Sequence, residues 1–199
     1  MKTTLNAINA LYPTPTVLAG AMVDGKPNFI TIAHIGIVNH ARPYLISLSS
    51  AKAHYTNKGI KANKAFSVNM PSENLVVETD YAGIVSGKTT DKSALFEVFY
   101  GQVENAPMIK KCPVNMECRL YDIYDTPTHD LFIGEIVQTH AEESVLTDGK
   151  IDLAKLKPLL FDMSSIKYWS VGQVVADCWK VGKQLKAPGV FQNRDHTPV

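Results

Sequence analysis

Residues 16–34 read TVLAGAMV-DGKP-NFITIAH, two apolar runs that flank a four-residue turn signal. The first run, Thr16 to Val23, consists of small and β-branched residues, and the Asp24-Gly25-Lys26-Pro27 segment is typical of a tight turn. The second run, Asn28 to His34, alternates between two faces of a strand. One face carries Phe29, Thr31 and Ala33, and the other carries Ile30 and Ile32. The stretch therefore predicts a β-hairpin.

The rest of the chain repeats the strand pattern and interrupts it with a few helices. Period-two alternation marks YLISLS (44–49), AFSVNM (65–70) and VNMECRL (114–120), and DLFIGEIVQTHAE (130–142) and IKYWSVG (166–172) are also predicted to be strands. A first helix is predicted from an N-cap at Ser72 to a stop at Gly87, and a second from a cap at Asp91 to Gly101. Many short strands with few helices indicate a mainly β fold with helical insertions, an antiparallel barrel.

Length and composition point to one ordinary globular domain. The chain has 199 residues, 45% of them hydrophobic and 20% charged, with a formal net charge of +1. This balance gives no electrostatic signature of nucleic-acid or membrane binding. We expect a cytoplasmic protein with a domain at 1–182 and a tail at 183–199. Its three cysteines, Cys112, Cys118 and Cys178, are expected to be reduced and mostly buried, without a metal site.

Donors of hydrogen bonds and positive charge gather in Ser49-Ser50-Ala51-Lys52-Ala53-His54-Tyr55-Thr56, between two predicted strands. A short helix is predicted from near Thr56 to about Asn63. Hydroxyls, cations and a helix start are the groups that bind anions, and a second donor cluster, Ser86 to Thr90, could converge on the same anion. A solvated turn is the alternative. Neither a P-loop nor a dinucleotide-binding glycine motif is present.

The order of these motifs resembles the flavin reductase-like, FMN-binding split-barrel family, which includes the flavoredoxins and the archaeal ferric reductase. Seven segments carry the resemblance over residues 13–173. They are PTVLAGAMVDGKPNFITIAH, RPYLISLS, KAHYTNKGIKANKAFSVNM, SGKTTDKSALFEV, KKCPVNMECRLY, FIGEIV and KYWSVG. The resemblance implies a six-stranded antiparallel Greek-key split β-barrel, a homodimer, and one FMN held without a covalent bond in each subunit.

The resemblance also implies which residues bind the cofactor. It implies that Asn28, Thr31, Ile32 and Ala33 contact the flavin ring or the ribityl chain. It implies that the phosphate is bound by Ser49, Ser50, Lys52, His54 and Thr56, together with Ser86 and Lys88 from the second cluster. Tyr168 matches an aromatic position that borders the flavin, whereas Asp91 and Lys92 are expected to cap and brace a helix.

Several residues are given structural interpretations. His34 and His40 could approach the flavin edge, but we expect exposed loop positions for both. His129 is expected to brace a hairpin through a backbone hydrogen bond. Glu135 is expected to be structural and to face Arg119, and the direction of Trp169 is open.

Three functions remain as hypotheses. The first is an FMN-dependent oxidoreductase fed by NAD(P)H or a redox protein, in which the flavin carries the chemistry and no catalytic side chain is indispensable. The second is a flavin-binding electron carrier or sensor without turnover of its own. The third, a ligand-free or haem-binding barrel, is disfavoured by the donors of the phosphate loop.

Overall fold

The computed structural model describes residues 1–185. Its helices are α1 (Thr56–Asn63), α2 (Val76–Ile84) and α3 (Leu153–Leu156), with short 3-10 turns η1 (Glu73–Leu75), η2 (Glu143–Val145) and η3 (Val181–Gln184). Its strands are β1 (Thr14–Pro15), β2 (Val17–Val23), β3 (Lys26–Ile32), β4 (Ile35–Asn39), β5 (Leu45–Ala51), β6 (Ala65–Met70), β7 (Val98–Phe99), β8 (Met108–Ile109), β9 (Val114–Asp125), β10 (His129–Ala141), β11 (Leu146–Thr147), β12 (Lys150–Ile151), β13 (Leu160–Asp162) and β14 (Lys167–Trp169). Most of the predicted tail, 186–199, lies outside the described residues.

The predicted hairpin is confirmed as β2 and β3. Val23 pairs with Lys26 across a turn in which Asp24 has a φ of 50° and Gly25 a φ of 78°. Both values are left-handed, as the two-residue turn that matches the twist of a hairpin requires. The register also separates the two faces of β3, since Phe29 packs in one hydrophobic cluster and Ile30 in another.

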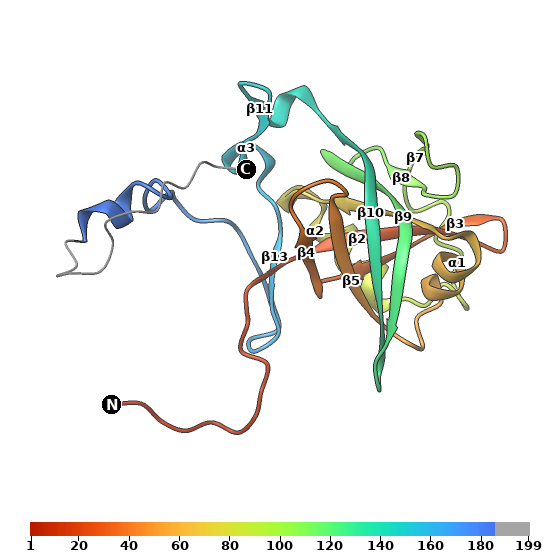
Figure 1. Cartoon of the computed structure of the whole chain (residues 1–199). Helices are drawn as coiled ribbons and strands as arrows, with labels where there is room; N and C mark the ends of the chain where they lie inside the picture. The colour runs from red at the N-terminus through yellow and green to blue at the C-terminus, as the bar shows by residue number, and fades with distance from the viewer. Residues whose placement is uncertain (186–199) are drawn as a thin grey trace.

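The hairpin belongs to a seven-stranded antiparallel sheet in the order β3-β2-β6-β9-β10-β5-β4 (Figure 1). The mainly β fold is confirmed, but the expected six strands are wrong, because the IGIVN segment adds β4 as a seventh. β3 and β4 lie at opposite edges, yet only Ala33 and His34 separate them in the sequence. The sheet must therefore curl until its two edges meet. β3 and β4 are not paired with each other in the described chain, so the sheet is not a closed barrel, and we call the opening between them the split.

The inside of the curled sheet holds the main hydrophobic cluster. It is formed by Val17, Ala19, Ala21, Ile30, Ile32, Ile46, Leu48, Ile60, Phe66, Val68, Cys118 and Phe132. The alternation of Ile46 and Leu48 against Ser47 and Ser49 is confirmed, since only the apolar pair is buried. Cys112 is also buried, while Cys178 is exposed.

The second predicted helix, 92–101, is wrong. Residues 93–95 form a turn, and Val98–Phe99 pairs with β8 as a small antiparallel ladder. This segment covers the outer face of the sheet, where polar side chains need partners. Ser67 donates to the carbonyl of Pro107, and Asn69 accepts from the Ile109 N–H at 2.9 Å. These bonds hold residues 107–109 against the sheet, and Val98–Phe99 pairs with them as β7 with β8, a non-local arrangement that local periodicity does not reveal.

The remaining helices follow the sequence more closely. The short helix is confirmed as α1 with the expected bounds. The first long helix is confirmed in part: η1 and α2 cover 73–84, so the helix ends at Ile84 and not at Gly87. Its N-cap residue Ser72 makes no capping hydrogen bond to the backbone. None of the helices among residues 1–185 is long and apolar enough to cross a membrane.

A fully buried carboxylate fastens the covering segment to the sheet. Glu117 of β9 is 0% exposed. One of its oxygens accepts the Val103 N–H at 2.6 Å, and the other is hydrogen-bonded to His140 Nε2 at 2.6 Å. Gly101 packs so closely that a β-carbon there would fall 2.0 Å from Glu117 Oε1. Burial of this carboxylate is tolerated because both oxygens are bonded.

We predict that Glu117→Ala lowers the free energy of unfolding by about 3 kcal/mol, because it strands the Val103 N–H and opens a cavity. Glu117→Gln keeps one acceptor and should cost about 1 kcal/mol. Urea unfolding followed by circular dichroism measures both. Equal stability of wild type and the Ala variant would show that the pair does not anchor this segment.

Candidate functional site

A cavity of about 320 Å³ opens at the split of the sheet. Its walls come from β3 and the Ala33–His34 crossing, the end of β5, helix α2, and β13 and β14. We call it the split cavity. It is lined by Thr16, Thr31, Ile32, Ala33, His34, Ser49, Ala51, His54, Asp80, Gly83, Ile84, His129, Phe161, Met163 and Tyr168.

Half of the twelve residues predicted to bind a cofactor meet in the split cavity. They are Thr31, Ile32, Ala33, Ser49, His54 and Tyr168. The topology explains the convergence: the Ser49 N–H donates to the His34 carbonyl at 2.9 Å and draws β5 toward the crossing. Small Ala33 leaves room beside the wall, and Thr31 is fixed by a hydrogen bond to the Thr79 carbonyl of α2.

His54 is held in one tautomer by a chain of hydrogen bonds. The side-chain amide of Asn57 donates hydrogen bonds to the Ala51 carbonyl at 3.0 Å and to the Asp130 carboxylate at 3.1 Å. Its oxygen accepts the Ser50 hydroxyl proton at 2.6 Å. Ser50 Oγ, 3.0 Å from His54 Nδ1, must then accept the Nδ1 proton. In the neutral imidazole this leaves Nε2 as the acceptor.

The surroundings of His54 are electropositive. Its pKa is lowered, first by partial burial and then by the charges of His129 and Lys92. The rings of His34 and His129 meet edge to face with centroids 6.0 Å apart on the same wall. Asp80 is the only carboxylate among the described residues that line the split cavity. An anion would therefore be favoured at this end of the cavity.

Thr16 supplies a buried hydroxyl to the split cavity that sequence reasoning missed. Thr16 is 2% exposed, and its Oγ1 has no hydrogen-bond partner among the described residues. Its backbone N–H donates to the Leu159 carbonyl at 2.9 Å, which fixes its position between β1 and β2. A buried hydroxyl without a partner is costly, and a polar ligand in this cavity would satisfy it.

Tyr168 closes the cavity from β14. Its hydroxyl donates to Asp80 Oδ1 at 3.0 Å, and its ring leans on Phe161 with centroids 5.9 Å apart. Partial burial and the Asp80 carboxylate raise the pKa of Tyr168 to about 12, so it remains a donor at neutral pH. Trp169 points elsewhere: it is exposed and is absent from the cavity wall.

Two more of the predicted residues, Asn28 and Lys88, line a neighbouring cavity of about 330 Å³. We call it the hairpin cavity, since it lies between the β2–β3 turn and the 87–92 loop. Asn28 donates to Thr56 Oγ1 at 2.7 Å. A β-carbon on Gly87 would fall 2.3 Å from Asn28 Oδ1, so glycine is needed for the loop to approach β3.

The other four predicted residues lie outside both cavities. Ser50 and Thr56 are buried behind the walls and support His54 and Asn28. Lys52 is exposed and pairs with Asp125 at 2.6 Å. Ser86 is exposed, and its carbonyl accepts the Thr90 N–H at 2.9 Å in a turn. The structure thus brings Ser49 and His54 of the first donor loop to the split cavity, but not Lys52.

Of the residues that were expected to have structural roles, some line the split cavity and others do not. His129 braces its hairpin as predicted, since its carbonyl accepts the Thr126 N–H at 3.0 Å, but its ring also lines the cavity. His34 is exposed and lines the split cavity, whereas His40 is exposed and does not. Glu135 faces Arg119 across β9 and β10 as expected, without an ion pair among the residues described.

The expectation that Asp91 and Lys92 cap and brace the helix after them is wrong, because residues 93–95 form only a turn. Asp91 accepts the Ser93 N–H at 2.9 Å and pairs with Lys26 at 2.6 Å. Lys92 donates to two carbonyls at the end of α2, the preceding helix. The direction of the Lys92 side chain could not be predicted from the sequence, because a long lysine side chain can reach several neighbours.

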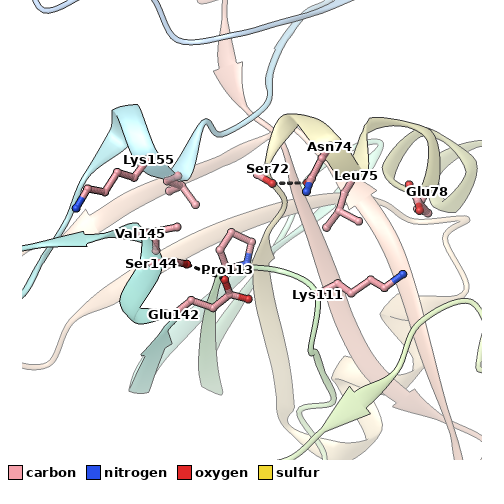
Figure 2. Close-up of a pocket in the computed structure, with 11 residues that line it drawn as sticks. Ser72, Asn74, Leu75, Glu78, Lys111, Pro113, Glu142, Ser144, Val145 and Lys155 are labelled. Atoms are coloured by element: carbon pink, nitrogen blue, oxygen red, sulfur yellow. Dashed lines mark hydrogen bonds between the residues drawn. The ribbon is translucent and has the colours of Figure 1, made fainter.

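Two further cavities differ in their distance from the split cavity: one adjoins it and the other lies elsewhere in the fold. One of about 670 Å³ shares Ala33, His34, Ser49 and His129 with the split cavity and is closed by residues 8–12. Figure 2 shows another, of about 510 Å³, between η1 and η2. The amines of Lys111 and Lys155 point away from each other there, and none of the predicted cofactor residues lines it. Its mixed charges do not form a focused anion site.

Comparisons with known proteins agree with the resemblance. A family model described as "Flavin reductase like domain" matches residues 9–170. The structure of flavoredoxin from Methanosarcina acetivorans is 43% identical with a TM-score of 0.90, covering 92% of this chain and 98% of that chain. Flavoredoxin of Desulfovibrio vulgaris (Miyazaki F) is 35% identical with a TM-score of 0.84, covering 92% and 100%. An FMN-binding protein from Thermus thermophilus, 21% identical with a TM-score of 0.75 over 89% and 97%, shares the fold.

We predict that His54→Gln reduces the acid sensitivity of the protein without ligand. The pKa of His54 in the folded protein lies below its ordinary value of 6.5. The unfolded chain therefore binds this proton more readily, so the contribution of His54 to stability is present above pH 6.5 and is lost as pH falls below it. Urea unfolding near pH 7 and near pH 5 should show a smaller loss for the variant. An identical loss in both proteins would contradict the assignment.

Proposed function

The chain belongs to the flavin reductase-like domain family, and we propose that it is an FMN-binding oxidoreductase of the flavin reductase or flavoredoxin type. It would move electrons between a reduced donor, either NAD(P)H or a redox protein, and flavin, ferric iron or another acceptor. The observation that carries this proposal is the convergence of six predicted flavin contacts on the split cavity, beside the unpartnered hydroxyl of Thr16.

The residues present fit a flavin nucleotide. A flat ring needs a narrow cleft with a small residue on its wall, and Ala33 supplies it on the face that Thr31 shares. Polar ring and ribityl atoms need donors and acceptors, which Thr16, Ser49 and Tyr168 offer. The phosphate, with close to two negative charges, needs the electropositive end around His54.

In this proposal the protein positions the cofactor, and the cofactor carries out the redox reaction. A bound flavin supplies one- and two-electron transfer chemistry. Thr31 and Tyr168 are held by α2 through Thr79 and Asp80, so the cavity wall is set before a ligand arrives. We propose no indispensable acid–base side chain, because transfer to a stacked ring depends on proximity and orientation.

FMN titration of the purified protein, followed by quenching of flavin fluorescence, tests the site. We expect saturable binding by wild type and a roughly tenfold weaker affinity for Thr16→Val, which loses one buried hydrogen bond to the ligand. The melting temperature of the ligand-free variant should not fall, since the change removes a buried hydroxyl that has no partner. Absence of FMN binding by wild type would refute the proposed function.

Anaerobic mixing of the FMN-loaded protein with NADH and with NADPH separates the enzyme from its alternative, a flavin-binding carrier or sensor. Rapid bleaching of flavin absorbance by a nicotinamide nucleotide, followed by repeated turnover with an acceptor, is expected for the oxidoreductase. Bleaching only by a reduced protein donor would favour the carrier. An absorption spectrum of haem in the purified protein would exclude both.

We also propose that two copies associate. The segments before β1 and after β14 run away from the sheet in Figure 1. They expose large apolar side chains, among them Leu5, Ile8, Leu11, Val174, Val175 and Trp179. Exposed apolar side chains on such arms favour burial against a partner protein. A second copy of this chain is the partner that is always present. Light scattering should give twice the 21.9 kDa of one chain, and a Val174→Asp, Val175→Asp variant should dissociate more readily. A concentration-independent monomer would contradict this.

A further inference from the structure

A further cavity, of about 510 Å³, lies between β7, residues 110–115 and the end of β10. We call it the outer cavity. Among the side chains that line it are Phe99, Cys112, Pro113, Asn115, His140 and Glu142. It shares Pro113 and Glu142 with the cavity of Figure 2, but it shares no lining residue with the split cavity or the hairpin cavity. It is therefore separate from the site proposed for FMN.

Asn115 offers a buried acceptor to the outer cavity. It is 4% exposed, and its side-chain nitrogen donates to the Ile109 carbonyl at 2.9 Å and to Asn69 Oδ1 at 2.8 Å. A carbonyl can only accept, so these bonds fix which end of the amide is the nitrogen. The other end, Oδ1, accepts no hydrogen bond from residues 1–185. It is not among the fully buried, unpartnered polar atoms of the described chain, which are all threonine hydroxyls. Asn115 Oδ1 must therefore meet open space, and the outer cavity is the space that Asn115 lines.

His140 forms a fixed wall beside this acceptor. It is the cross-strand partner of Asn115 in the pairing of β9 with β10. Its Nε2 lies 2.6 Å from the buried Glu117 carboxylate, which can only accept, so Nε2 carries a proton. The second ring nitrogen, Nδ1, has no hydrogen-bond partner in the described chain. Phe99 meets the same ring edge to face, with centroids 5.7 Å apart. The imidazole is thus held from two sides.

The outer cavity has a net negative charge. Lys110 and Glu97 both line it and pair with each other at 2.7 Å, so their charges compensate. Glu142 has no basic partner within 4.0 Å among the residues described. The pair of Glu117 and His140 is neutral when the imidazole is protonated and negative when it is not. In either state the charge of Glu142 remains in excess.

The charge of Glu142 acts on an otherwise apolar wall. The pKa of the Cys112 thiol is raised, first by burial and then by the charge of Glu142. Cys112 is 1% exposed and shares the wall with Val98, Phe99 and Pro113. A negative potential over apolar side chains, with one buried acceptor, favours a ligand that joins a positive charge to an apolar body.

We infer that the outer cavity binds a small organic cation, an ammonium group on a flat apolar body. The ammonium group donates to Asn115 Oδ1 in the field of Glu142, and the apolar body packs on Phe99 and Pro113. This site goes beyond the proposed function, because it needs no flavin. A ligand there would also join β7 of the covering segment to β9 and β10, which supply the other walls.

Benzylamine is the probe, because it joins an ammonium group to a phenyl ring. Titration of the full chain, followed by two-dimensional amide NMR spectra, should saturate on the order of 1 mM, as expected for so small a ligand. The shifts should fall at residues 97–99, 110–115 and 140–142, and the side-chain amide signals of Asn115 should move with them. Methylamine lacks the ring and benzoate has the opposite charge, so each should bind at least about tenfold more weakly.

Two adjacent exposed carboxylates provide a matched pair of variants. Glu142→Gln removes the charge from the outer cavity and should weaken benzylamine binding about threefold or more. Glu143→Gln, which changes a residue outside the cavity wall, should leave the affinity unchanged. Asn115→Ala removes the buried acceptor and should weaken binding at least about tenfold. If that variant does not fold by circular dichroism, the Asn115 side-chain signals of wild type decide: absence of a shift overturns the inference.

Three other results would overturn it as well. They are benzoate binding as tightly as benzylamine, shifts centred on another surface of the protein, and equal losses for Glu142→Gln and Glu143→Gln. Each of them leaves the proposed function untouched, because the titration contains no flavin. FMN should not displace benzylamine, since the outer cavity and the split cavity have no wall in common.

Discussion

The structure depends on one constraint: two consecutive strands, β3 and β4, lie at opposite edges of the same sheet and are joined by only two residues. The edges cannot be far apart, so the sheet must curl on its right-handed twist. They do not pair with each other, so a gap remains. Ala33 and His34 cross it, and the split cavity opens beside them. The cavity is therefore a consequence of chain connectivity, and the lining side chains only determine its chemistry.

Helix α2 turns that gap into a defined site. Within two turns it accepts the Thr31 hydroxyl at Thr79, accepts the Tyr168 hydroxyl at Asp80, and offers the Ala82 carbonyl to Lys92. These contacts connect three walls that come from distant parts of the sequence. Residues held from several directions have little freedom to rearrange, which favours a preformed pocket.

The sequence predicted the hairpin, α1 and the interior face of β5 because local chemistry decides each of them. The turn residues Asp24 and Gly25 fit left-handed conformations, and Ile46 and Leu48 alternate with serines. It failed at 92–101, where the apolar pattern suits a helix but Phe96 packs on Phe29 of the sheet and Val98–Phe99 pairs with β8. It could not foresee Thr16 or Lys92 either. Whether a threonine keeps a free hydroxyl, or a lysine bends back to a helix end, depends on neighbours remote in sequence.

The balance of charge at the split cavity explains why a ligand would stabilise the whole fold. Partial burial and the nearby charges of His129 and Lys92 oppose protonation of His54. An anionic group bound beside His54 would reduce this penalty, since it favours the charged form of the imidazole. Binding to the folded state alone also shifts the folding equilibrium by mass action. Under the proposed function, an anionic ligand bound beside His54 would therefore stabilise the folded protein as it binds.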